Sequence, residues 1–226
     1  LIANNTVRTG TNGITVGYGS TNTVVRGNTI LHQTSRGIYI VGTSASLTRV
    51  ESNRVAGAAT NGIRIEDAYR TTVRGNTVES NAVVGIALAG GRTNETRTNT
   101  IRRVATGIAV SGGATPSVGA VLDGNDLRTN SIDGVRLDVG GRDADVRRNT
   151  GVGNARAAIL IAGGTNSVLT YNVLRGNGAG FRVSNLAPSL VERNLVTNNA
   201  AGFRVVAGGV ATVRYNNLGG NVTNLS

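Results

Sequence analysis

The fold is decided by the stretch Val73-Arg74-Gly75-Asn76-Thr77-Val78, which is followed after a short polar run by Gly85-Ile86-Ala87-Leu88. Variants of this pair recur along the whole chain. The first half reads as an apolar residue, two residues, Asn, one residue and a second apolar residue; the second half reads as Gly, apolar, variable, apolar. The repeated Asn residues are 22 to 26 positions apart, and they are Asn5, Asn28, Asn53, Asn76, Asn99, Asn125, Asn149, Asn172, Asn194 and Asn216. Such a period predicts a repeat architecture.

The period and the residue types together predict a parallel β-helix. Apolar and polar residues alternate over short runs such as Gly62-Ile63-Arg64-Ile65, which is the periodicity of a strand. No unit contains ten or more residues at helical spacing. A period near 23 residues holds three short strands and three turns, the size of one right-handed coil. We therefore predict an all-β, right-handed, single-stranded parallel β-helix (a solenoid) of about nine to ten coils, stacked about 4.8 Å apart.

The repeated apolar positions predict a core that runs along the solenoid. They are Val, Ile or Leu in most units, and β-branched side chains pack well on strands. The Asn residues are expected to stack as an internal ladder of side-chain amides. A second, partial ladder is predicted at Asn81, Asn130, Asn154, Asn177, Asn199 and Asn221. No linker interrupts the pattern, so we expect residues 1–226 to form one domain.

Both ends of the sequence stop within a unit. Ile2 already occupies an inward position, and the last unit stops at Asn224-Leu225-Ser226, where its Gly-apolar half should begin. Neither end has the amphipathic cap that a solenoid needs. We therefore expect the chain to be a segment of a longer one with flanking domains, or to cover its ends by end-to-end self-association. The extra residues of the two longest units predict protruding loops at 41–49 and 111–119.

Composition limits the choice of partner. The 226 residues include 23 basic and 12 acidic ones, for a formal net charge of +11. This charge favours a polyanion, either an acidic polysaccharide or an anionic surface. Nucleic acid is disfavoured because there is no row of aromatic residues for base stacking. No run of 18 apolar residues is present, so no membrane span is expected. One His (His32) and no Cys are too few soft ligands for zinc or copper.

Function is expected on the outward columns, since the inward ones are filled. In the column between the two apolar residues after Gly, Tyr39 and Arg64 should be neighbours on adjacent coils, with Glu66 on the same face. These three are the candidates for a catalytic role: Arg can pair with the carboxylate of a uronate, and the group can support proton abstraction next to that carboxylate. The alternative is a Tyr that only stacks on an Arg. The same column supplies the candidate ligand-binding residues Arg136, Arg182 and Arg204.

Charged residues suggest two further features. The residue two before each Asn often alternates in sign between adjacent coils, as at Arg26, Glu51 and Arg74, which predicts a ladder of ion pairs. Six of the 12 acidic residues lie within 123–145, where carboxylates can hold calcium. The calcium candidates are Asp126, Asp133 and Asp138. Interleaved arginines favour local ion pairing instead, so we predict no cofactor and no metal, with calcium as the alternative.

The repeats quoted above resemble those of the pectate-lyase-like superfamily. More narrowly, they resemble right-handed β-helix repeat proteins that include NosD-like periplasmic proteins and mannuronan epimerases. The resemblance covers nearly the whole chain and implies a β-helix, a bias toward carbohydrate and a secreted, periplasmic or cell-surface location. The catalytic motifs of the enzymes are missing: His32 follows Leu31 and does not match an Asp-Pro-His-Asp signature, Gly-His-Gly is absent, and there is no Lys. No catalytic residue is carried over.

The sequence therefore favours a noncatalytic extracytoplasmic β-helix segment that is structural or binds acidic polysaccharide. One alternative is a polysaccharide lyase or uronate epimerase that acts on an outward sheet face. A second alternative is a self-associating or designed structural solenoid. Whether the chain is an enzyme stays open, with the missing motifs weighing against it.

Overall fold

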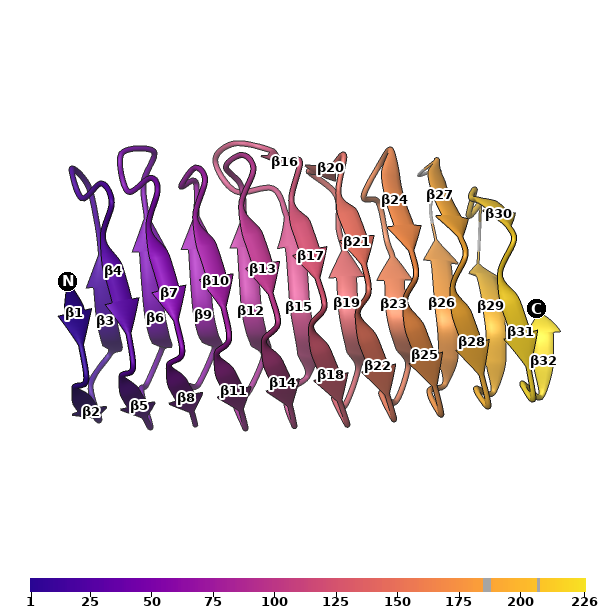
Figure 1. Ribbon diagram of the computed structural model, residues 1–226, viewed down its shortest axis with the longest axis horizontal. Coiled ribbons are helices and arrows are strands. Elements are labelled where there is room, and N and C mark those ends of the chain that lie inside the picture. The colour runs from indigo at the N-terminus through magenta and orange to yellow at the C-terminus, as the bar shows by residue number, and fades with distance from the viewer. Residues whose placement is uncertain (185–187, 207) are drawn as a thin grey trace.

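The computed structural model describes residues 1–184, 188–206 and 208–226, and the chain winds into a stack of coils (Figure 1). Each coil contributes one strand to each of three parallel sheets, and each sheet has ten strands. The described ranges contain no helix that is long and apolar enough to cross a membrane. The structure thus confirms an all-β solenoid of about ten coils with three short strands per coil.

The three long sheets are named A, B and C in the order in which the chain enters them. Sheet A consists of β1 (Ile2–Ala3), β4 (Val24–Arg26), β7 (Arg49–Glu51), β10 (Thr72–Arg74), β13 (Glu95–Arg97), β17 (Val121–Asp123), β21 (Asp145–Arg147), β24 (Ser167–Thr170), β27 (Ser189–Glu192) and β30 (Thr212–Arg214). Sheet B consists of β2 (Thr6–Arg8), β5 (Thr29–Leu31), β8 (Arg54–Ala56), β11 (Thr77–Glu79), β14 (Thr100–Arg102), β18 (Asp126–Arg128), β22 (Thr150–Val152), β25 (Val173–Arg175), β28 (Leu195–Thr197) and β31 (Asn217–Gly219). Sheet C consists of β3 (Asn12–Val16), β6 (Arg36–Val41), β9 (Asn61–Glu66), β12 (Val84–Ala89), β15 (Thr106–Ser111), β19 (Asp133–Leu137), β23 (Ala157–Ile161), β26 (Ala179–Ser184), β29 (Ala201–Val206) and β32 (Thr223–Leu225). A small fourth sheet pairs β16 (Ser117–Val118) with β20 (Gly141–Arg142).

The predicted inward columns form the core. Equivalent residues pair in register from coil to coil, as Val50, Val73 and Thr96 do in sheet A, and all three are fully buried. Phe181 and Phe203 pair across β26 and β29 and stack inside, with ring centroids 4.9 Å apart. Burying an aliphatic or aromatic side chain stabilises the fold by about 1.5–3 kcal/mol. Because each coil fills the same columns, the core is continuous along the axis.

One pair of exceptions to the repeat is explained by packing. In most coils, the apolar residues of the sheet C strand directly follow a Gly. At Gly85, an added Cβ would come within 2.4 Å of the Ile101 side chain. In one coil Ala158 occupies this column, and the inward position of sheet B in that coil is Gly151. A Cβ at Gly151 would lie 2.8 Å from the Cβ of Ala158. The methyl group of Ala158 therefore occupies the space that a side chain at position 151 would need. Alanine fits at position 158 only because position 151 is glycine.

The first predicted asparagine ladder is present, and so is the second from Asn130 to Asn221, whereas Asn81 stands apart because Val104 occupies this column in the coil between Asn81 and Asn130. At the turn from sheet A to sheet B, the backbone N–H and side-chain Nδ2 of Asn53 donate to Oδ1 of Asn76 at 2.8 and 3.0 Å. Nδ2 of Asn76 donates to the carbonyl of Val50 at 2.9 Å. At the turn from sheet B to sheet C, Asn154 donates to Asn177 in the same way. These amides satisfy buried backbone groups along the axis, so their role is structural.

The turns from sheet C to sheet A depart most from the repeat. They form the upper edge in Figure 1, and we call this region the C–A edge. The two loops predicted to protrude, at 41–49 and 111–119, both lie there, and the second contains the extra strand β16. The turns from A to B and from B to C are short in every coil. Variation between coils is therefore concentrated on one edge of the solenoid.

Candidate functional site

The three candidate catalytic residues lie together on the outer face of sheet C. Strands β6 and β9 place Tyr39 opposite Arg64 and Val41 opposite Glu66, so two adjacent coils supply the group. The Tyr39 hydroxyl donates to Oε2 of Glu66 at 2.7 Å, and Nε of Arg64 donates to the same oxygen at 2.8 Å. The guanidinium of Arg36 lies 4.3 Å from the centroid of the Tyr39 ring. The stacking contact considered from the sequence is thus made by Arg36.

A cavity of about 430 Å³ opens beside this group. Its lining includes Tyr39 and Glu66 from sheet C and Thr115 from the C–A edge two coils further on. Asp67 holds that loop in place: Oδ1 accepts from the N–H and the hydroxyl of Thr115 at 2.9 and 2.8 Å, and Oδ2 accepts from the N–H of Ala114 at 3.2 Å. Sequence reasoning missed Asp67 and Thr115 as a wall of the site. The only signal for them was the extra length of one repeat unit.

These contacts set the protonation of the group. Burial and the hydrogen bond to Glu66 raise the pKa of Tyr39 to about 12. The hydrogen bond from Arg64 lowers the pKa of Glu66, although partial burial opposes it. Near neutral pH, Tyr39 is therefore a neutral phenol and Glu66 is a carboxylate. The group can hydrogen-bond a ligand or donate a proton, whereas proton abstraction by Tyr39 as it stands requires strongly alkaline conditions.

The three candidate ligand-binding arginines have different surroundings. Nε of Arg136 is 2.7 Å from Oδ1 of Asp138, so this guanidinium is ion-paired. Arg182 and Arg204 pair across β26 and β29, and neither forms an ion pair within the described part of the chain. Leu160, opposite Arg182 on the preceding strand, packs in a small apolar cluster outside the main core. Of the three arginines, Arg182 and Arg204 therefore remain available to an external anion.

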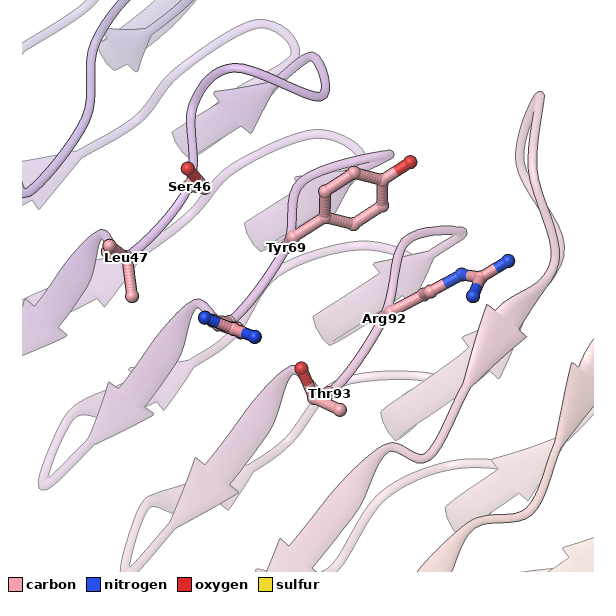
Figure 2. Close-up of a pocket in the computed structure, with 6 residues that line it drawn as sticks. Ser46, Leu47, Tyr69, Arg92 and Thr93 are labelled. Atoms are coloured by element: carbon pink, nitrogen blue, oxygen red, sulfur yellow. The ribbon is translucent and has the colours of Figure 1, made fainter.

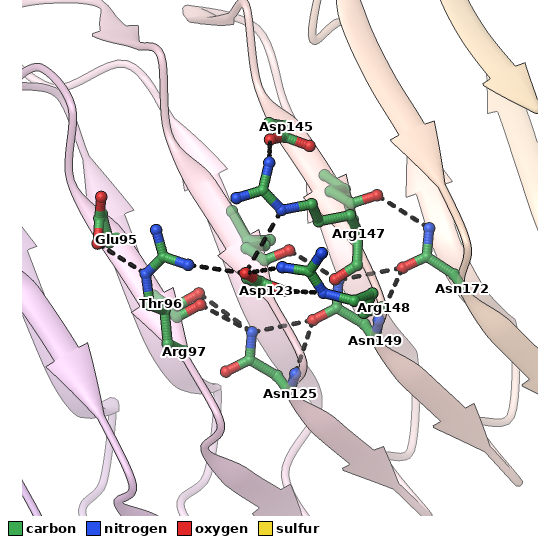
Figure 3. A network of polar contacts seen from close by, with 12 residues as sticks. Glu95, Thr96, Arg97, Asp123, Asn125, Asp145, Arg147, Arg148, Asn149 and Asn172 are labelled. Carbon is green, nitrogen blue, oxygen red and sulfur yellow. Dashed lines mark hydrogen bonds and ion pairs between the residues drawn. The ribbon is translucent and has the colours of Figure 1, made fainter.

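Asp123 gathers three arginines on the outer face of sheet A, as Figure 3 shows. Its Oδ2 is 2.7 Å from Nη1 of Arg97, and Arg147 and Arg148 approach from the next coil. Burial acts to raise the pKa of Asp123, but the hydrogen bonds and charges of Arg148 and Arg147 outweigh it, so the pKa is lowered. Arg97, Asp123 and Arg147 occupy one column. The predicted ladder of ion pairs is confirmed there, and its role is structural.

Glu79 forms a second cluster of this kind on sheet B. Its carboxylate lies 2.8 Å from Nη2 of Arg54, 3.0 Å from Nη2 of Arg102 and 2.5 Å from Nη2 of Arg103. Burial acts to raise the pKa of Glu79, but the hydrogen bonds from Arg102 and Arg54 lower it overall. This carboxylate is also fully engaged by the protein, so it offers no ligand for a metal.

The three candidate calcium ligands each pair with an arginine and lie apart in the fold. The pairs are Asp126 with Arg128, Asp133 with Arg156, and Asp138 with Arg136. Asp126 is on β18 in sheet B, whereas Asp133 begins β19 in sheet C and Asp138 directly follows the end of that strand. Within the described ranges, no three His, Cys, Asp or Glu side chains are grouped so as to hold a metal ion. The structure thus favours local ion pairing of these carboxylates.

Two family profiles match the chain. The one described as "Right handed beta helix region" matches residues 1–101, and the one described as "Periplasmic copper-binding protein (NosD)" matches residues 90–226. Together they confirm the resemblance to right-handed β-helix repeat proteins, and the second description agrees with the expected extracytoplasmic location. No curated protein sequence matches the chain.

Solved structures of an alginate epimerase, an alginate lyase and a tailspike in complex with a pentasaccharide share the fold. A double mutant of the periplasmic alginate epimerase AlgG matches with a TM-score of 0.74 at 15% identity, over 86% of this chain and 50% of that one. The alginate lyase from Paenibacillus sp. str. FPU-7 matches with a TM-score of 0.77 at 15% identity, over 97% and 91%. A tailspike double mutant of E. coli bacteriophage HK620, in complex with a pentasaccharide, matches with a TM-score of 0.66 at 15% identity, over 91% and 43%.

These structural matches establish the β-helix fold and nothing finer. The chain spans about half the length of the alginate epimerase structures that it matches. At 15% identity, side-chain roles do not transfer from one protein to another.

The donor set of this chain does not fit a copper centre. Copper sites in proteins use His, Cys and Met ligands, and the sequence has one His, no Cys and no Met. His32 lies at an exposed turn with a φ of 59°. The described residues bring no group of three or more His, Cys, Asp or Glu side chains together there or elsewhere. The copper in the family's description therefore has no matching site among these side chains.

Proposed function

The chain belongs to the family described as periplasmic copper-binding protein (NosD), and we propose that it is a noncatalytic, extracytoplasmic β-helix that binds acidic polysaccharide. The polymer lies on the outer surface, because the inward columns are filled by the core. Arg182 and Arg204, which form no ion pair among the described residues, contact the carboxylates of the polymer.

The observation that carries this proposal is the unequal use of acidic and basic side chains. Ten of the 12 acidic side chains form ion pairs with arginine. The other two, Asp67 and Asp143, accept hydrogen bonds from Thr115 and Asn166. Nine of the 23 arginines form no ion pair among the described residues, namely Arg8, Arg26, Arg36, Arg70, Arg92, Arg142, Arg175, Arg182 and Arg204. This surplus of guanidinium groups is available to an external polyanion.

The guanidinium group of arginine is well suited to bind carboxylates. A guanidinium can donate two parallel hydrogen bonds to one carboxylate, which an ammonium group cannot. The fold neighbours support a saccharide as the polyanion, since by their names they include an alginate epimerase, an alginate lyase and a tailspike in complex with a pentasaccharide. On sheet C, Arg182 and Arg204 stand on adjacent coils about 4.8 Å apart, a spacing close to the length of one pyranose in an extended chain.

Affinity electrophoresis and calorimetry with alginate and polygalacturonate at low salt test this function, with unsubstituted dextran as the neutral control. We expect retardation in both acidic gels, none in dextran, and weakening as salt is raised, because exposed charge contacts are screened. The pair R182Q and R204Q should weaken binding more than R8Q and R175Q, which remove equal charge from sheet B. Absence of retardation in either acidic gel would reject the proposal and favour a purely structural or self-associating solenoid.

A second candidate function is a polysaccharide lyase or uronate epimerase at Tyr39, Arg64 and Glu66. It is favoured by one observation: Tyr39 and Glu66 line a cavity of about 430 Å³, and Arg64 donates a hydrogen bond to the same oxygen of Glu66 as Tyr39 does. In this function Arg64 neutralises a uronate carboxylate, and Tyr39 transfers a proton at the adjacent carbon. The raised pKa of Tyr39 weighs against it, since the base form is scarce near neutral pH.

Turnover separates the two functions. Incubation with alginate or pectin is followed by the absorbance of unsaturated uronates for a lyase, and by sugar NMR for an epimerase. The binding proposal predicts no turnover by the wild-type protein. Activity that is lost in Tyr39→Phe and that rises with pH toward 12 would establish the enzyme instead.

A further inference from the structure

A second hollow, of about 360 Å³, lies on the C–A edge. It is lined by pairs of residues from three successive coils, which are Ser46 and Leu47, Tyr69 and Arg70, and Arg92 and Thr93. The side chains labelled in Figure 2 come from all three coils. The backbone holds them in register: the N–H of Leu47 donates to the carbonyl of Tyr69 at 3.0 Å, and the N–H of Arg70 donates to that of Arg92 at 2.9 Å. Tyr69 and Arg92 project to the same side of their coils (Figure 2). The floor is therefore rigid backbone with side chains rising from it.

The side-chain polar groups that line this hollow are guanidinium and hydroxyl groups, and they have no partner among the described residues. Arg70 and Arg92 are exposed and form no ion pair in the described part of the chain. The hydroxyls of Ser46, Tyr69 and Thr93 make no hydrogen bond to the described residues either. No carboxylate lines the hollow. A guanidinium only donates, so the complementary ligand is an anion that also carries hydroxyl groups.

Further toward the C-terminus, the C–A edge carries another exposed arginine, Arg142. Backbone bridges run from Tyr69 to Arg92 and from Arg92 to Val118, and Val118 pairs with Arg142. Arg142 is exposed, has no ion-pair partner among the described residues, and lines a neighbouring hollow of about 310 Å³. Arg92 and Arg142 are thus two coils apart, about 10 Å along the axis. One small anion cannot reach both, whereas an extended polymer with repeated charges can.

We infer that the C–A edge is a binding track for an extended uronic acid polymer, with a carboxylate subsite at Arg70 and Arg92 and a second contact at Arg142. This inference rests on the proposed function, and it locates the polymer on the C–A edge and not only on the face of sheet C. The track is separate from the Tyr39 group, whose cavity contains neither Arg70 nor Arg92.

Calorimetry with oligomannuronates of increasing length tests the track. The double variant R70Q/R92Q is compared with R8Q/R175Q, which removes the same charge at exposed arginines on sheet B that form no ion pair among the described residues. We expect about a tenfold loss of affinity for the edge variant, as two exposed charge contacts disappear, and a change of less than about twofold for the control. R142Q should weaken binding of long oligomers and leave that of disaccharides unchanged. Circular dichroism confirms that each variant keeps its β-structure.

The outcomes distinguish this inference from the proposed function. If the wild type binds no acidic polysaccharide, the proposed function fails and the track fails with it. If the wild type binds but R70Q/R92Q loses no more affinity than the control, the track is wrong and the proposed function stands. Methyl-esterified polygalacturonate and dextran sulfate identify the anion: we expect no binding of the ester and weaker binding of the sulfate. Equal binding of the ester would overturn the carboxylate assignment.

Discussion

Arginine plays opposite parts in two regions of the molecule. Around Asp123 on sheet A, three guanidinium groups converge on one buried carboxylate (Figure 3). On the C–A edge, Arg70 and Arg92 line a hollow that has no carboxylate among its lining residues; Figure 2 shows Arg92 there. The residue type is the same, and its role is decided by whether an acidic side chain occupies a neighbouring coil. We expect the first region to stabilise the stack of coils and the second to bind an external anion.

The largest effect on stability is expected from Asp123→Asn. The substitution keeps the shape of the side chain but leaves three guanidinium groups without their anion, so we expect a loss of about 2–3 kcal/mol in the free energy of unfolding. Asp126→Asn is the matched control, because the ion pair of Asp126 with Arg128 is more exposed; it should cost less than about 1 kcal/mol. Urea unfolding followed by circular dichroism measures both. Equal losses would mean that burial of the acid is not what distinguishes the first region.

The next effect is a pH dependence carried by Glu79. Its pKa is lowered below the ordinary 4.5 in the folded protein, so its contribution to stability is complete above pH 4.5 and is lost as pH falls through the lowered value. Glu79→Gln should therefore lower stability by about 1–2 kcal/mol at pH 7. The difference from wild type should shrink to near zero once the pH is below the folded pKa. A difference that stays constant in acid would show that the charge of Glu79 is not the cause.

A single arginine substitution in each region sharpens the comparison. Arg147→Gln removes a partner of Asp123 and should lower stability by about 1 kcal/mol, without affecting polysaccharide binding. Arg92→Gln on the C–A edge should change stability by less than about 0.5 kcal/mol and weaken binding. Thermal unfolding and calorimetry on the same samples report both quantities. If Arg147→Gln weakened binding and Arg92→Gln lowered stability, the roles assigned to the two regions would be wrong.

The smallest effect is expected for Tyr39→Phe. Oε2 of Glu66 keeps its hydrogen bond from Arg64, so loss of the phenol should cost only about 0.5 kcal/mol. The ring keeps its contact with Arg36. Chemical denaturation measures the change; a loss above about 2 kcal/mol would indicate that the group is a structural element of the same kind as the Asp123 cluster.

Part of the candidate site could be predicted from the sequence because it follows from the register. Tyr39, Arg64 and Glu66 occupy outward positions on adjacent coils, and the repeat alone brings them together. Their partners were harder to foresee. The sequence grouped Arg136 with Arg182 and Arg204, but only the structure shows that Asp138 engages the first.

The sequence by itself determined the stack of coils, the core columns and both asparagine ladders. These features recur at a fixed spacing in most units, and strand periodicity assigns each residue to the inside or the outside. Only the tertiary structure decided how the C–A edge is built, where Asp67 holds Thr115 from 48 residues away and the hollow at Arg70 and Arg92 forms. The physical reason is that the turns of this edge differ from coil to coil, so their contacts depend on side chains that meet across coils and carry no repeating signal.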